Sequence, residues 1–229
     1  MQPWSSPDSV EGTTIGRGVE APARVGPTAA ASPRVKVFYV LYVPDGEIRA
    51  CIDTIRFFID PDQKWRAHIT VRGPYELGAD VSQLDQYLEG NEVYVLGVDQ
   101  FSGKNQCTVF LRCDGTKLRQ VWDKPDYPYN PHITLYDGDS REVAEELIRV
   151  VGEYHYRLRF RCDRLQPLIS VKGAINTELS SSYDPWYMAR ILGEYIPSSV
   201  VRTLPLDTRL KFIDRISCHL AGLTEDSTQ

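Results

Sequence analysis

The chain has 229 residues, of which 42% are hydrophobic and 25% are charged, with a formal net charge of −5. This length accommodates one sizeable domain or two small ones, and the apolar content is sufficient for a packed core. The negative balance argues against non-specific binding of long nucleic acid, which requires many Lys and Arg contacts to phosphates. A small nucleotide or a short RNA end remains compatible with it.

Residues 1–33 are rich in Pro, Gly, Ala, Ser and Thr and show no apolar periodicity, which predicts a flexible tail. The tail lacks the basic start and apolar run of a secretion signal, its acidic residues disfavour a transit peptide, and no stretch reaches membrane-spanning length. The five cysteines form no Cys-x-x-Cys pair, and their odd number is typical of free thiols in a reducing compartment. We therefore expect a cytoplasmic protein.

The first part of the remaining chain predicts a strand, a helix and a strand. Residues 35–43 are apolar on both faces, as in a central strand, and Asp45 is placed to cap a helix that runs to about Ile59. A strand is predicted over residues 64–71 and is closed by Gly73-Pro74. A second helix over 80–88 and a hairpin over 91–101 and 106–112 follow it.

A short helix over 116–122 and a proline-rich loop then lead to a second strand, helix and strand series. Tyr127 and Tyr129 in that loop are candidates to stack on a nucleobase, with surface packing as the alternative. The turn before Ser140 predicts a capped helix over 141–151.

The next predicted strand, over 154–163, carries three arginines on one face. These residues are Arg157, Arg159 and Arg161. They either lie on a solvent-exposed face of the strand or extend a phosphate-binding groove. A last strand over 168–171 ends this series. Beyond residue 175, an amphipathic helix either docks against the core or offers a surface for a protein partner or a second copy.

One tripeptide occurs twice, as His68-Ile69-Thr70 and as His132-Ile133-Thr134. In both copies apolar and polar residues alternate with the period of a strand, so the histidine and the threonine share one face. A single histidine near a threonine is usually an ordinary polar residue of a half-buried strand. Two identical copies among only four histidines favour a functional pair.

Two imidazoles suit the cleavage of a phosphodiester, since a neutral ring accepts a proton while a protonated ring donates one. The hydroxyls would donate hydrogen bonds to phosphate oxygens where negative charge accumulates. This chemistry requires neither a metal ion nor a cofactor. The sequence shows no His-Glu-x-x-His motif and no grouped Cys and His ligands of a zinc site.

At these motifs the chain resembles the 2H phosphoesterase superfamily, which includes the 2′-5′ RNA ligase-like proteins and the cyclic phosphodiesterases. The resemblance implies an α+β fold of two pseudo-symmetric α/β lobes, with antiparallel sheets facing a central cleft and one motif in each lobe. It extends over residues 34–174, and it leaves residues 175–229 as a C-terminal helical extension.

The resemblance also implies roles for residues of the two motifs. His68 and His132 would be the acid and the base, in an order that the sequence leaves open, and Thr70 and Thr134 would bind the phosphate. The residues two positions after each threonine differ from one another. These residues, Arg72 and Tyr136, are candidates for substrate selection.

The predicted function is that of a metal-independent phosphodiesterase acting on a nucleotide or RNA end, at a 2′,3′-cyclic phosphate or a 2′-5′ linkage. The substrate partner would be a nucleotide or short RNA, with no membrane and no long duplex. The alternative is a nucleotide- or RNA-binding module that keeps the cleft without turnover.

Overall fold

The computed structural model describes residues 35–63, 65–76, 79–124, 127–171 and 185–223. All of these residues belong to one compact unit, which spans residues 33–229. The predicted flexible tail, residues 1–33, lies outside the described residues.

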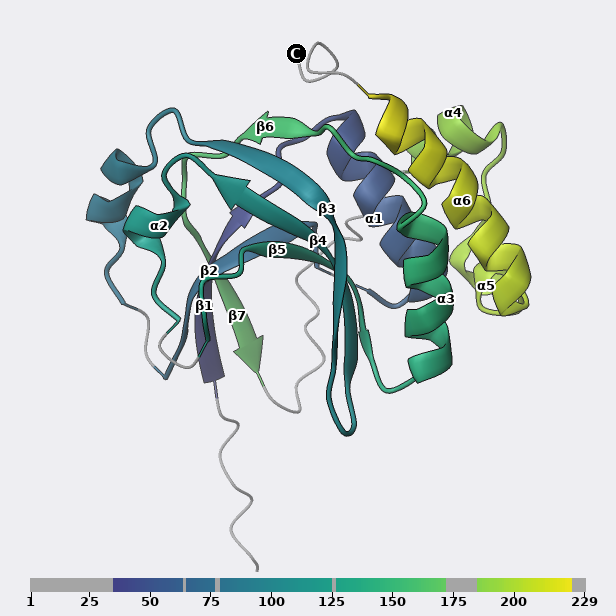
Figure 1. The fold of residues 1–229 in the computed structure, drawn as a ribbon, viewed down its shortest axis with the longest axis horizontal. Helices are drawn as coiled ribbons and strands as arrows, with labels where there is room; N and C mark the ends of the chain where they lie inside the picture. The colour runs from purple at the N-terminus through teal and green to yellow at the C-terminus, as the bar shows by residue number, and fades with distance from the viewer. Residues whose placement is uncertain (1–34, 64, 77–78, 125–126, 172–184, 224–229) are drawn as a thin grey trace, which may run out of the picture. The chain divides into compact units, whose positions relative to one another are not determined.

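A seven-stranded sheet in the order β6-β3-β4-β5-β2-β1-β7 forms the centre of the unit (Figure 1). Every neighbouring pair in it is antiparallel. The strands are β1 (Val35–Tyr42), β2 (His68–Tyr75), β3 (Glu92–Ser102), β4 (Cys107–Gly115), β5 (His132–Gly138), β6 (Arg159–Arg161) and β7 (Gln166–Val171). The hairpin predicted around Gly103 is therefore confirmed as β3 and β4.

The mixed α and β class is confirmed, and so is the antiparallel pairing. One half of the sheet contains β2, β1 and β7, and the other contains β6, β3, β4 and β5. The halves meet where Ile69 of β2 pairs with Ile133 of β5. Because these two strands pair directly, the expected two sheets are joined edge to edge into one continuous sheet.

One face of this sheet is covered by α1 (Glu47–Ile59) and α3 (Arg141–Val151) (Figure 1). The apolar faces of both motif strands point into this layer, where Ile69, Val71 and Ile133 are fully buried and Leu135 is 2% exposed. The alternation predicted for the two motifs is confirmed, so the histidines and threonines lie on the opposite face of the sheet.

The C-terminal helices are α4 (Pro185–Leu192), α5 (Ser198–Val201) and α6 (Leu206–Gly222). The apolar stripe of α6 packs against α1 and α3, and Phe212 stacks on Phe58 of α1 with ring centroids 5.0 Å apart. The expected docking of the amphipathic helix on the core is therefore confirmed. Within the described ranges, no helix combines the length and the apolarity that crossing a membrane requires.

The start of α1 differs from the prediction. Gly46 occupies the N-cap position with a φ of 147°, and no side chain caps the helix there. Asp45 instead forms an ion pair with Arg49, one turn into the helix. A carboxylate near the first turn still faces the positive end of the helix dipole, although it accepts no backbone hydrogen bond as a cap.

The boundaries of the first motif strand also differ from the prediction. The strand β2 begins at His68, and just before it the Trp65 carbonyl and the Ala67 N–H bond to side chains of α1. It continues through Gly73-Pro74 to Tyr75. Gly73 has a φ of 98°, and a Cβ there would lie 2.8 Å from the carbonyl oxygen of Val37. Only glycine accommodates both constraints, so the predicted stop signal is an internal part of the strand.

Three shorter elements complete the comparison. The helix expected over 80–88 is a 3₁₀ helix, η1 (Ser82–Tyr87), and the short helix before the second motif is α2 (Leu118–Val121). The strand expected over 154–163 is observed only as β6, and Tyr154, which precedes it, donates a hydrogen bond to Asp214 of α6.

Candidate active site

The pairing of β2 with β5 brings the two motifs together. Because Ile69 lies opposite Ile133 in an antiparallel ladder, His68 lies beside Thr134, and Thr70 lies beside His132. Each histidine therefore neighbours the threonine of the other motif, as the pseudo-symmetry implied by the resemblance requires.

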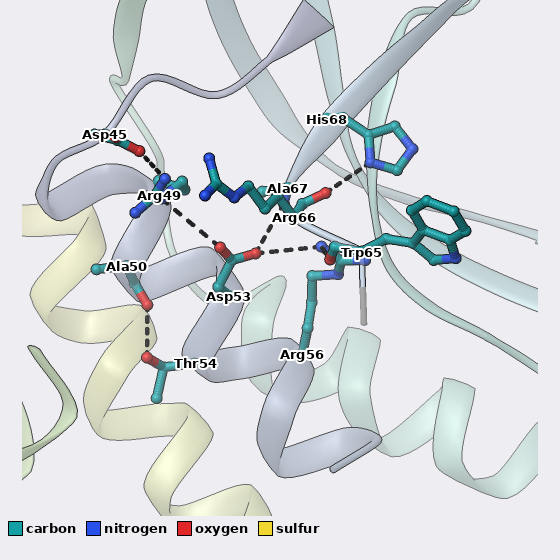
Figure 2. Close-up of polar contacts among 10 residues, drawn as sticks. All are labelled: Asp45, Arg49, Ala50, Asp53, Thr54, Arg56, Trp65, Arg66, Ala67 and His68. Carbon is teal, nitrogen blue, oxygen red and sulfur yellow. Dashed lines mark hydrogen bonds and ion pairs between the residues drawn. The ribbon is translucent and has the colours of Figure 1, made fainter. Parts of the chain in front are cut away.

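Both histidines are held in the same way by the backbone that precedes them. The Nδ1 atom of His68 lies 2.6 Å from the carbonyl oxygen of Arg66 (Figure 2), and that of His132 lies 2.7 Å from the carbonyl oxygen of Asn130. Because a carbonyl oxygen only accepts hydrogen bonds, Nδ1 carries the proton in each neutral ring. The Nε2 atom is then left with a lone pair that can accept a proton.

Aromatic rings pack against each imidazole. Phe110 and Phe101 lie 4.7 and 5.5 Å from His132 between ring centroids, and Tyr42 lies edge-on to His68 at 5.9 Å. These contacts restrict the orientation of both rings and remove water from one side of each.

Burial is the main cause that lowers the pKa of His68 from 6.5 to about 4; the bond to Arg66 opposes it, and the positive charges of Arg56 and of a protonated His132 add to it. Burial also lowers the pKa of His132, with a contribution from Lys124. Both rings are therefore neutral at pH 7. The negative charge of a bound phosphate would raise these pKa values again.

A groove opens beside the second motif and has a volume of about 560 Å³. It is lined by β5, by the turn between β3 and β4 and by the loop before β5. Its lining residues are Phe101, Gly103, Gln106, Thr108, Trp122, Lys124, Tyr127, Pro128, Asn130, His132, Thr134 and Asp137. The volume lies within the range of small-molecule sites.

The groove lining includes several aromatic side chains and the ammonium group of Lys124. Lys124 lies 5.5 Å from the ring of Trp122 and 5.0 Å from the ring of Tyr127, as in cation–π contacts. Tyr127 is 60% exposed. Tyr129 instead packs against Trp122 and donates a hydrogen bond to Asp114. Of the two tyrosines considered for base stacking, only Tyr127 lines the groove.

The two candidates for substrate selection have partners within the protein. Arg72 donates to the carbonyl oxygen of Val121 at 2.9 Å and to Asp123 Oδ2 at 2.8 Å. The hydroxyl of Tyr136 accepts a hydrogen bond from the Ser140 backbone N–H at 3.0 Å. A contact with substrate would have to compete with these bonds, and the role in selection stays a prediction for both residues.

Several residues around the site were not singled out by the sequence. Lys124, Phe101 and Asp137 reach the groove from three separate segments, and only the hairpin and the loop geometry bring them together. Arg159 and Arg161 lie on the edge strand β6, where both pair with Glu92, so they do not extend the groove beside β5. Among the described residues, no group of three or more His, Cys, Asp or Glu side chains is placed to hold a metal ion.

Comparison with known proteins bears on both motifs. The family model for the 2′-5′ RNA ligase superfamily matches residues 44–173, a span that contains His68, Thr70, His132 and Thr134. It supports the resemblance to the 2H phosphoesterases. No curated protein matches the sequence. Since the matched span covers more than half of the 229 residues, the chain belongs to the 2′-5′ RNA ligase superfamily.

Proposed function

We propose that this protein is a metal-independent phosphodiesterase that cleaves a 2′,3′-cyclic phosphate or a 2′-5′ linkage in a nucleotide or at an RNA end. The observation that carries the proposal is that both imidazoles form the same hydrogen bond, from Nδ1 to the carbonyl two residues earlier. Each Nδ1 is committed to a backbone carbonyl, and the two Nε2 atoms remain available for proton transfer beside two threonine hydroxyls.

The reaction requires one group that accepts a proton from the attacking water and another that donates a proton to the leaving oxygen. In hydrolysis of a cyclic phosphate, one neutral Nε2 accepts a proton from water, and the resulting hydroxide attacks phosphorus. The bond from phosphorus to one ribose oxygen breaks, and the second imidazole, protonated on both nitrogens, donates its Nε2 proton to that oxygen. Thr70 and Thr134 would donate hydrogen bonds to the non-bridging oxygens. The order of the two histidines follows from which side of phosphorus the leaving oxygen occupies.

The groove supports a nucleotide as the substrate. Its aromatic wall offers Tyr127 and Trp122 as surfaces for a base, and Lys124 offers a positive charge near the second motif. A ligand in this groove would place its phosphate next to His132 and Thr134. The net charge of −5 is consistent with a short substrate and unfavourable for a long duplex. We keep the cytoplasm as the proposed compartment, because all five cysteines are free thiols.

The test is a product assay in EDTA with the purified protein. The panel contains 2′,3′-cyclic mononucleotides, 2′-5′ and 3′-5′ linked oligonucleotides, and cyclic oligonucleotides. We expect cleavage of a cyclic phosphate or a 2′-5′ linkage, reduced roughly 10²- to 10⁴-fold by His68→Ala and by His132→Ala.

Two results would contradict the proposal. Near wild-type turnover in either histidine variant would exclude the paired mechanism. Saturable binding without any product, from a folded wild-type protein, would favour the binding module over the enzyme.

A further inference from the structure

A buried ion pair on α1 lies directly beneath the start of β2 (Figure 2). Asp53 and Arg56 are each 3% exposed, and Arg56 Nη1 lies 3.2 Å from Asp53 Oδ1. Charged side chains are rarely buried to this extent unless they are paired and hydrogen-bonded. The helix position alone requires neither charge, so their bonds to other segments indicate what they do.

Both charged groups reach across to the residues before His68. Arg56 Nη1 donates to the carbonyl oxygen of Trp65 at 2.7 Å, and Asp53 Oδ1 accepts from the backbone N–H of Ala67 at 2.8 Å. The N–H of Ala67 belongs to the same planar peptide group as the carbonyl of Arg66. That carbonyl accepts the bond from His68 Nδ1 at 2.6 Å.

One peptide group is therefore bonded at both ends, to a carboxylate through its N–H and to an imidazole through its oxygen. From the structure we propose that Asp53 is a positioning residue for His68 and acts on its imidazole through the Arg66–Ala67 peptide group. The proposal rests on the proposed role of His68 in proton transfer.

The physical basis is the polarity of this chain of bonds. A carboxylate that accepts from the N–H draws that proton outward and increases the negative charge on the carbonyl oxygen of the same peptide. A stronger acceptor at Arg66 holds the proton of His68 on Nδ1 and makes Nε2 more basic, as a carboxylate does when it accepts directly from a histidine. The second charge near Asp53 is Arg49, whose Nε lies 3.9 Å from Oδ2.

The second motif has no equivalent of this connection. The carbonyl that accepts from His132 Nδ1 belongs to Asn130, and the nitrogen of that peptide group is the nitrogen of Pro131. Proline has no N–H, so no carboxylate can act on His132 by this route. The two histidines share one tautomer, but only that of His68 is coupled to a buried charge.

The first measurement is the ¹⁵N spectrum of the histidine rings, which reports the tautomer and requires no substrate. We expect Asp53→Asn to shift His68 from the Nδ1–H tautomer toward a mixture, while His132 in the same sample is unchanged. The double variant Asp53→Asn/Arg56→Gln leaves no unpaired buried charge, and it keeps the test available if the single variant does not fold. Thr54→Val is the control, since among the described residues the hydroxyl of Thr54 bonds to the Ala50 carbonyl of its own helix and to no residue of β2.

The second measurement is kinetic and uses the substrate identified by the product assay. We expect both Asp53 variants to lower kcat about 10- to 100-fold with little change in KM, because the base or acid is misplaced while the groove stays intact. Thr54→Val should leave both constants near the wild-type values.

An unchanged His68 spectrum in a folded Asp53 variant would overturn the inference. An equal shift of His68 and His132, or an equal effect of Thr54→Val, would also overturn it, since either result would mean general loosening of the fold. Failure of the proposed function would appear separately, as a wild-type protein without turnover, and would leave the spectroscopic test valid.

Discussion

Replacing His68 with asparagine should change how the stability of the protein depends on pH. Burial lowers the pKa of His68 from 6.5 to about 4, so the unfolded chain binds a proton in this window that the folded imidazole does not bind. The free energy of unfolding then falls as the pH falls from 6.5 toward 4. Asparagine cannot titrate, and its side-chain amide can still donate to the carbonyl of Arg66.

The size of the effect follows from the size of the shift. A fully realised shift from 6.5 to about 4 corresponds to about 3 kcal/mol, at 1.36 kcal/mol for each pKa unit. Because the ring of His68 is only half-buried, solvent screens part of this difference, and we expect about 1.5 kcal/mol. Between pH 7 and pH 4, the wild-type protein should therefore lose that much more stability than His68→Asn.

The assay is urea denaturation at several pH values between 4 and 7, for the wild-type protein, His68→Asn and Thr70→Val. Thr70 lies on the same strand face and does not titrate, so the Thr70→Val curve should run parallel to that of the wild type. With a typical slope for urea, the expected difference corresponds to a midpoint change of about 0.5 to 1.5 M. Parallel curves for the wild type and His68→Asn would refute the assignment of a lowered pKa to His68.

Three further predictions concern the two motif threonines, the groove and a helix cap. Thr70→Val and Thr134→Val should each lower kcat by roughly 10-fold or more, because each removes one donor to the developing charge; wild-type kinetics in both would make them strand formers only. Lys124→Met should raise KM and weaken its dependence on salt, since Lys124 is a charge on the groove wall, and an unchanged KM would place the substrate elsewhere. Ser140→Ala should lower the free energy of unfolding by about 1 kcal/mol, because the Ser140 hydroxyl accepts a hydrogen bond from the Val143 N–H. Thermal denaturation measures this loss, and an unchanged Tm would contradict the capping role of Ser140.

The sequence predicts the chemistry-bearing strands well, because their alternation is a local property of the chain. Ile69 and Ile133 are apolar at the right period, and both are fully buried as predicted. The cap at Ser140 and the helix from Arg141 to Val151 are equally local, and both are observed. The family is recognisable from two tripeptides for the same reason.

What the sequence does not reveal depends on contacts between distant segments. Asp53 and Arg56 look like part of the polar face of an amphipathic helix, and only the folded chain shows that they bond to the Trp65–Ala67 segment. The stop expected at Gly73-Pro74 is overridden by the close approach of β1. Arg72 follows the first motif as a free cation in the sequence, whereas in the structure it is paired with Asp123.

The relative position of the two motifs depends on the register with which β2 pairs with β5. The two histidines come from different halves of the sheet, and their approach is set by the pairing of Ile69 with Ile133. A slip of one residue would turn one motif toward the helices and bury its imidazole, since side chains alternate with period two. Insertions in the loops of either half should leave that pairing intact, because loops lie outside the sheet. Under the proposed function, the outer loops could therefore change to suit different substrates, while the pairing of these two isoleucines would keep the two histidines at the distance that joint action requires.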